Sequence, residues 1–278
     1  MDILKWQERF STDLKLKYSN SAQTRKNYHS CVVTFLRYFS EAKEPKAIAT
    51  DDIKKYLLSQ FTTANTLRAN LCAVKAFYKI TVGMPSKIDR IPFPQKERRL
   101  PQIIDQADVQ KMFDVCANLK HKCIMAVLYG TGVRVSELIG IRLTDIQRAS
   151  GTIRVIGKGS KERVVPMNES LLKIIEQYYR QYKPAEYLFE NDYSKRQYTA
   201  RSVNAFLRQF KDKAHIVAPV TAHKFRHSNA TALLEQGTDI RIIQKQLGHN
   251  SLKTTQIYTH VSKAVVANIY SPINNIHF

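Results

Sequence analysis

Four side chains that can act on a phosphate ester lie within residues 221–260. They are His223, Arg226, His249 and Tyr258. An arginine binds phosphate oxygens through paired hydrogen bonds and keeps its charge at physiological pH. A phenol beside such cations can shift toward phenolate and become a nucleophile. These residue types therefore indicate nucleophilic attack on a phosphate, with positive charge available to stabilise the negative charge that develops.

Three consecutive short helical segments are expected to carry these side chains. The first places His223 and Arg226 on one face, because residues three apart are neighbours on a helix surface. Gly237 is expected to end this helix and Gly248 the next one, as glycine commonly does at helix C-termini. Tyr258 lies near the end of the third segment. Short helices joined by turns can fold around one point, so the four side chains are expected to converge.

The balance of charge indicates what the protein binds. The 278 residues include 44 lysines and arginines against 23 aspartates and glutamates, a formal net charge of +21. Such an excess of one sign favours a polyanion as partner, and a membrane surface is the weaker alternative. No apolar run is long enough to span a bilayer and the N-terminus lacks the apolar core of a signal peptide, which predicts a cytoplasmic protein. The cysteines have no metal-ligand spacing and are expected to be reduced packing residues.

Glycine and proline divide the chain into two expected domains. Residues 1–83 contain one proline and one glycine, which predicts an all-helical domain. Residues 84–104 contain four of the nine prolines and are predicted to be an extended linker without helix. The second domain is expected to cover residues 105–278.

A predicted helix over residues 64–80 carries a row of cations. Arg68, Lys75 and Lys79 are spaced at i, i+7 and i+11, which places them on one stripe of the helix. In a chain this basic, the stripe is expected to contact DNA phosphates. The alternative is an ordinary solvated face.

The second domain mixes helices with a small β-structure. Strands are predicted at residues 152–156 and 163–165, joined by a glycine-rich hairpin tip that carries Lys158. Arg134 follows a glycine-flanked turn, where the backbone can approach a ligand closely. The expected fold is therefore mainly α with a small β-sheet: an all-helical N-terminal domain followed by a mixed α+β domain.

Five separated motifs follow one another along the second domain. Arg134 lies in G-x-R-x-S-E-L, Lys158 lies in G-K-G-x-K-E-R, His223 and Arg226 form H-x-x-R, His249 ends L-G-H, and Tyr258 follows nine residues later. This order resembles the tyrosine recombinase (phage integrase) family, and within it the Xer recombinases. The resemblance implies that the helical domain is a core-binding domain that clamps DNA and that residues 105–278 form the catalytic domain.

The resemblance also implies the reaction. Tyr258 would attack the scissile phosphate of DNA and form a 3′-phosphotyrosyl bond, releasing a 5′-hydroxyl. His223 would hydrogen-bond the tyrosine or take its proton, and Lys158 would protonate the leaving oxygen, with Lys161 as the competing candidate. Tyr270 is the next candidate nucleophile. No metal, ATP or other cofactor is expected.

The other motif residues would stabilise charge around the phosphate. Arg134 and Arg226 are expected to offset the extra negative charge of the transition state, and His249 to hydrogen-bond a non-bridging oxygen. Glu137 is expected to orient this cluster without touching the phosphate; its alternative is a plain acid on a helix surface.

A metal enzyme is the first rival interpretation. His223 and His227 have the i, i+4 spacing of a zinc pair, but Lys224 replaces the glutamate of H-E-x-x-H and Arg226 would repel a cation. His227, together with His215 and His260, is therefore expected to be a structural or surface residue.

Two further functions share the charge or the chemistry: a non-enzymatic DNA-binding protein and a type IB topoisomerase. The motif order favours a recombinase, either an integrase or a Xer-type resolvase, working as a tetramer on DNA. Residues 261–278 carry an apolar stripe on a helix too short to stand alone, so this tail is expected to mediate assembly or to fold back on its own domain.

Overall fold

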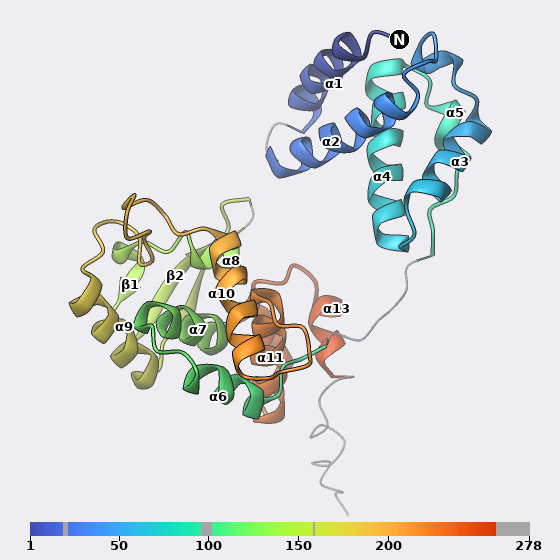
Figure 1. Cartoon of the computed structure of the whole chain (residues 1–278). Helices are drawn as coiled ribbons and strands as arrows, with labels where there is room; N and C mark the ends of the chain where they lie inside the picture. Colours follow the sequence, from blue (N-terminus) through green and yellow to red (C-terminus); the bar gives the residue numbers. More distant parts are fainter. Residues whose placement is uncertain (19–21, 96–101, 158, 260–278) are drawn as a thin grey trace, which may run out of the picture. The chain divides into compact units, whose positions relative to one another are not determined.

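The computed structural model describes residues 1–18, 22–95, 102–157 and 159–259 (Figure 1). The chain divides into two compact units, Met1–Arg99 and Leu100–Phe278. Helices dominate both units, and one three-stranded sheet lies in the second. The predicted fold class is confirmed.

The first unit is a bundle of helices around an aromatic core. Its elements are α1 (Ile3–Lys17), α2 (Ala22–Tyr38), α3 (Thr50–Gln60), α4 (Ala64–Phe77) and α5 (Ser86–Asp89), with a 3-10 turn at Pro45–Ala47 and a π-helical turn at Tyr78–Val82. Phe77 packs edge to face on Phe10 with ring centroids 5.3 Å apart. Such pairs add to the stabilisation that burial of the rings already provides.

The prediction of a wholly extended linker over residues 84–104 is wrong at both ends. Ser86–Asp89 forms the helix α5, and Ile88 and Ile91 are buried in the core of the first unit. Ile104 is buried in the core of the second unit. Proline is compatible with the start of a helix, so Pro85 precedes α5 without disrupting it. Burial of the apolar side chains determined the structure here, which proline content alone did not indicate.

The second unit packs helices against a small antiparallel sheet. Its elements are α6 (Gln106–Asp114), α7 (Leu119–Thr131), α8 (Val135–Leu138), β1 (Ile146–Gln147), β2 (Thr152–Ile156), β3 (Glu162–Pro166), α9 (Glu169–Tyr182), α10 (Ala200–Lys213), α11 (Ala222–Glu235), α12 (Ile240–Leu247) and α13 (Leu252–Thr255), with 3-10 turns at Leu143–Asp145 and Gln256–Tyr258. The strands lie in the order β1-β2-β3, and Val155 pairs with Arg163. The short strand β1 was not predicted.

The helix α7 runs through the middle of this unit. Its side chains are buried on several faces, including Cys123, Ile124, Val127 and Leu128. A second, smaller cluster contains Ala230, Ile243, Leu247 and Tyr258. The C-terminal end of α7 and this smaller cluster supply the backbone on which the candidate site is built.

Candidate active site

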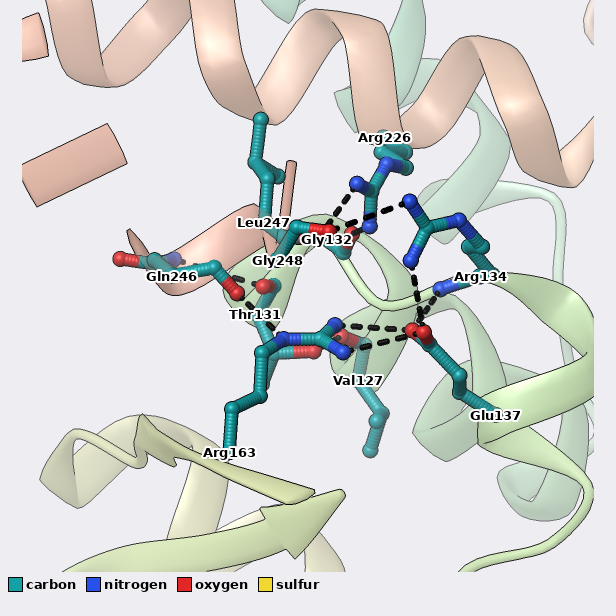
Figure 2. Close-up of polar contacts among 10 residues, drawn as sticks. All are labelled: Val127, Thr131, Gly132, Arg134, Glu137, Arg163, Arg226, Gln246, Leu247 and Gly248. Atoms are coloured by element: carbon teal, nitrogen blue, oxygen red, sulfur yellow. Dashed lines mark hydrogen bonds and ion pairs between the residues drawn. The ribbon is translucent and has the colours of Figure 1, made fainter. Parts of the chain in front are cut away.

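The buried guanidinium of Arg226 organises the site. Arg226 projects from α11 and is 1% exposed. Its Nη1 donates to the carbonyl of Gly132 at 2.7 Å, and its Nη2 donates to the carbonyl of Leu247 at 2.6 Å (Figure 2). These carbonyls belong to the C-terminal ends of α7 and α12, where the last carbonyls of a helix have no partner within the helix. Arg226 therefore joins three helices at one point.

Glycine is required at both of these helix ends. Gly132 and Gly248 have φ values of 65° and 64°, in the left-handed region that glycine adopts without strain. A Cβ at Gly132 would lie 2.4 Å from Oδ1 of Asn229, and one at Gly248 would lie 3.1 Å from Cδ of Arg163. Both turns are therefore tight enough for the arginine side chains to reach the backbone.

A buried carboxylate holds two further arginines. Glu137, whose side chain is 2% exposed, accepts from Nη1 of Arg134 at 2.8 Å and from the backbone N–H of Arg134 at 2.8 Å. It also accepts two hydrogen bonds from Arg163, at 3.0 and 2.8 Å. Burial raises the pKa of Glu137, but these hydrogen bonds and charges outweigh burial and hold the pKa below its usual range. Glu137 is thus buried and contacts both arginines, and its expected role in orienting them is still a prediction.

Arg163 is not among the residues that the sequence predicts for the site. Besides its pair of bonds to Glu137, its Nε donates to the carbonyl of Gln246 at 2.7 Å, which ties β3 to α12 (Figure 2). A signal was present in the sequence. Side chains alternate along a strand, so Arg163 lies on the same side of β3 as the buried Val165. A charged residue at an inward position of a strand indicates a buried partner of opposite charge.

Arg134 and Arg226 converge on consecutive peptide groups. Nη2 of Arg134 lies 3.5 Å from the carbonyl of Gly248, next to the Leu247 carbonyl that Arg226 binds. Burial, together with the positive charge of Arg134, lowers the pKa of Arg226 to about 10, so Arg226 is still cationic at neutral pH. The Arg134 side chain is 38% exposed and can reach a ligand from solvent.

Tyr258 is buried and lies close enough to Arg226 and Arg134 for their charges to act on its pKa. It is 1% exposed, and its hydroxyl is 2.9 Å from Nδ1 of His227. The ring of His249 stacks near it with centroids 6.3 Å apart, and Nδ1 of His249 is 2.9 Å from the hydroxyl of Thr255. Burial raises the pKa of Tyr258 more than Arg226 and Arg134 lower it. The expected shift toward phenolate is therefore wrong for the free protein, because desolvation dominates.

The structure places His223 differently from the sequence expectation. His223 is exposed at the start of α11, and the partner of the Tyr258 hydroxyl is His227, one helical turn further on. The two imidazole centroids are 4.3 Å apart. Although the residue as a whole is exposed, the protein around its ring desolvates it in part; this first, and the neighbouring Arg226 and Arg134 next, lower the pKa of His223. His227, expected to be a structural or surface residue, thus contacts the candidate nucleophile.

The remaining predicted residues lie elsewhere or outside the described part of the chain. Lys158, Tyr270, His260 and the tail 261–278 are outside the described residues, and Lys161 is exposed. In the first unit, the charged groups of Arg68 and Lys75 each lie 4.7 Å from the ring centroid of Phe93, and Lys79 is exposed. The basic stripe is therefore partly engaged by an aromatic ring, and its contact with DNA is still a prediction.

Among the residues that the structure describes, no group of three or more His, Cys, Asp and Glu side chains is placed to hold a metal ion. Within the same residues, no helix is both long enough and apolar enough to cross a membrane.

The sequence matches two family models that together span most of the chain. Residues 102–264 match the phage integrase family, and residues 6–88 match the phage integrase N-terminal SAM-like domain. The tyrosine recombinase XerC of Staphylococcus haemolyticus is 34% identical over 281 residues, which cover 94% of this chain and 94% of that protein.

Solved structures show the same architecture. The crystal structure of XerA recombinase matches with 27% identity and a TM-score of 0.57, covering 99% of this chain and 100% of that one. A lambda integrase tetramer bound to a Holliday junction matches in fold, with 16% identity and a TM-score of 0.75 over 91% of this chain and 76% of that one. Because one family model covers more than half of the chain and XerC is similar over nearly its whole length, this protein belongs to the phage integrase family and is a tyrosine recombinase, an enzyme that transfers DNA strands at specific sites.

Proposed function

We propose that this recombinase cleaves and rejoins double-stranded DNA with Tyr258 as its nucleophile. The observation that carries the proposal is the convergence of Arg226 and Arg134 on the carbonyls of Leu247 and Gly248. That turn leads directly to His249 and then to Tyr258, so the groups needed to bind a phosphate and to attack it lie together.

In the proposed reaction, the Tyr258 oxygen attacks the scissile phosphate and the 5′-oxygen leaves. Arg134 and Arg226 offset the negative charge that develops on the phosphate, because cations already held in place by hydrogen bonds need little reorganisation during the reaction. His249, and His223 at the exposed start of α11, hydrogen-bond non-bridging oxygens. Glu137 and Arg163 act by orienting Arg134. The broken phosphodiester is replaced by a phosphotyrosyl ester. The energy of the bond is therefore kept, and strand exchange needs no ATP.

Lys158 is proposed as the acid that protonates the leaving 5′-oxygen. An alkoxide is a poor leaving group, since the pKa of its conjugate acid is on the order of that of water, ~15.7. Replacing the bridging 5′-oxygen by sulfur gives a thiolate, whose parent pKa is only about 8.5 and which leaves without a proton. Lys158→Ala is expected to cleave ordinary DNA poorly and to recover on the sulfur-containing strand. Lys161→Ala is the matched variant. If only Lys161→Ala recovers cleavage on the sulfur-containing strand, Lys161 and not Lys158 is the acid.

The proposed partner is a recombination site in DNA, bound by four protomers. The net charge of +21 favours a polyanion. Lambda integrase, whose fold this chain shares, forms a tetramer on a Holliday junction. The enzyme is proposed to act on this DNA in the cytoplasm. The apolar tail 261–278 is proposed to join protomers, and its removal should spare binding to one site while impairing the paired complex.

Trapping the covalent intermediate tests this proposal. The protein is incubated with fragmented genomic DNA, and the DNA that survives denaturant while attached to protein is sequenced to map the site. Tyr258→Phe should still bind the mapped site and should form no adduct, and excess chelator should leave the wild-type adduct unchanged. An adduct formed by Tyr258→Phe would show another nucleophile. Relaxation of supercoiled DNA without strand exchange between sites would indicate a topoisomerase.

A further inference from the structure

The tyrosine hydroxyl has one direct side-chain contact among the described residues. His227 Nδ1 lies 2.9 Å from the Tyr258 hydroxyl oxygen, within the distance at which a base can take a proton. The two rings are tilted by 58° with centroids 5.5 Å apart, so the contact is made edge-on through the ring nitrogen. The imidazole tautomer with its hydrogen on Nε2 leaves the Nδ1 lone pair free to accept from the phenol.

Position on α11 separates the roles of the two histidines. His223 is exposed, where a phosphate from solvent can reach it, whereas His227 is partly buried and faces the 3-10 turn that carries Tyr258. Both side chains lie on the same face of the helix, because residues four apart are neighbours. His223 is therefore positioned for the substrate and His227 for the nucleophile.

The surroundings keep His227 neutral in the free protein. Burial first, and then His223, Arg226 and Lys224 on the same helix, lower its pKa to about 4. Tyr258 faces it from the 3-10 turn, and His249 lies close enough for its own pKa to be lowered by His227. A phosphodiester bound beside Arg226 would bring negative charge toward this group of cations, and an opposite charge nearby favours the protonated imidazole. Substrate binding would thus make His227 a stronger base when one is needed.

We propose that His227 is the catalytic residue that takes the proton of Tyr258 during cleavage and returns it during rejoining. This inference rests on the proposed role of Tyr258 as nucleophile. As the bond from the Tyr258 oxygen to phosphorus forms, the phosphorus–O5′ bond breaks. The phenol proton passes to Nδ1 of His227, and the 5′-oxygen takes its proton from a separate acid. In rejoining, a 5′-hydroxyl attacks the phosphotyrosine and gives its proton back to the conjugate base of that separate acid, while the imidazolium protonates the departing tyrosine oxygen.

The decisive variant keeps the hydrogen bond and removes the base. The amide oxygen of asparagine can occupy nearly the position of Nδ1. His227→Asn can therefore still accept a hydrogen bond from the Tyr258 hydroxyl, but its amide does not take up a proton at neutral pH. Single-turnover cleavage of a nicked duplex carrying the mapped site should slow by about 100-fold or more, the usual contribution of a general base. DNA affinity and the thermal unfolding midpoint should stay close to those of wild type. Wild-type cleavage by His227→Asn would overturn the proposal.

A more acidic phenol supplies the second arm. Replacing Tyr258 by 3,5-difluorotyrosine in His227→Asn should restore most of the lost rate, because that phenol ionises with less need for a base. The same replacement in His223→Asn, the matched variant one turn away, should not restore its activity. If fluorination fails to rescue His227→Asn, the imidazole only holds the tyrosine in place and the proposal is wrong.

A third measurement does not depend on the folding of any histidine variant. With His227 present, the cleavage rate should fall at acidic pH as the imidazole becomes protonated. Fluorination of Tyr258 should not change the pH at which this fall occurs. If the fall moves to lower pH in the fluorinated protein, the tyrosine ionises without His227. If Tyr258 is not the nucleophile, Tyr258→Phe will still form the covalent adduct, and this result distinguishes that error from an error about His227.

Discussion

The two units bury different kinds of side chain. In the described part of the first unit, the buried polar residues are Asn70 and Thr81, both neutral. Within its own described residues, the second unit buries five charged residues: Lys120, Glu137, Asp145, Glu190 and Arg226. Burying a charge is costly unless it is paired and hydrogen-bonded. The second unit therefore holds charged groups at fixed positions at a cost in folding free energy, and the first unit, as far as it is described, does not.

The buried charges of the second unit each have partners. Glu137 and Arg226 belong to the candidate site, whereas Glu190 accepts backbone N–H groups of residues 185–187 and Lys120 donates to the carbonyl of Glu190. The first unit instead depends on edge-to-face aromatic contacts around Phe35 and Phe77. The comparison predicts that electrostatic changes will affect the second unit far more than the first.

The largest expected effect is that of Glu137→Gln. The change leaves the guanidinium of Arg163, whose side chain is only 11% exposed, without its buried counter-charge, and breaking such a pair costs about 3–5 kcal/mol. Hydrogen exchange in denaturant, read separately for each unit, should show this loss of unfolding free energy in the second unit alone. Glu186→Gln is the matched control, because its ion pair with Arg142 is exposed and such pairs contribute about 0–1 kcal/mol. Equal losses in both variants would remove the distinction between buried and surface charge.

The next effect is on the pH dependence of folding. Burial lowers the pKa values of His227 and His249 to about 4, against an ordinary value of 6.5. Between pH 6.5 and 4 the unfolded chain binds protons that the folded state does not, so the unfolding free energy of the second unit should fall as pH is lowered through this window. His249→Asn, which can keep the bond to Thr255, should make the dependence shallower. A second unit equally stable at pH 7 and pH 4.5 would contradict these shifts.

A smaller effect is expected for a neutral hydrogen bond in the first unit. The buried hydroxyl of Tyr78 donates to the carbonyl of Pro45 at 2.8 Å, so Tyr78→Phe should lower the unfolding free energy of that unit by about 1 kcal/mol. Tyr56→Phe is the matched control, because the buried Tyr56 hydroxyl has no hydrogen-bond partner among the described residues. Removing it should be neutral or slightly stabilising. Urea unfolding of both variants checks the difference, and a costlier Tyr56→Phe would reverse the interpretation.

The smallest effect concerns the surface charge of the first unit. If Arg68 contacts a phosphate, Arg68→Ala should reduce the slope of log affinity for DNA against log salt by about 0.9 and leave folding nearly unchanged. Lys111→Ala is the control, since this lysine forms an exposed pair with Asp108 in the second unit. Fluorescence anisotropy across a salt series measures both slopes. An unchanged slope for Arg68→Ala would show that its guanidinium serves only to cover Phe93.

Much of the fold could be predicted from the conformational preferences and spacing of residues that are neighbours in the sequence. The left-handed turn at Gly248 follows from the steric freedom of glycine, and it ends α12 where the sequence predicted. The strand at 152–156 and the helix α11 follow from side-chain periodicity. The convergence of Arg226, His249 and Tyr258 was likewise expected, because short helices joined by tight turns leave few arrangements. The helix α5 was missed, because the packing of Ile88 into the core overrode the local proline signal.

By itself, the sequence determined which chemical groups the protein carries and the order in which short elements present them, since both depend on residue type and neighbouring residues. Only the tertiary structure decided which groups touch. Arg163 meets Glu137 across 26 residues and Gln246 across 83. His227, and not His223, reaches the Tyr258 hydroxyl. The direction of the Tyr258 pKa shift was also decided there, because desolvation and Coulomb attraction oppose each other and depend on burial and distance, which folding sets.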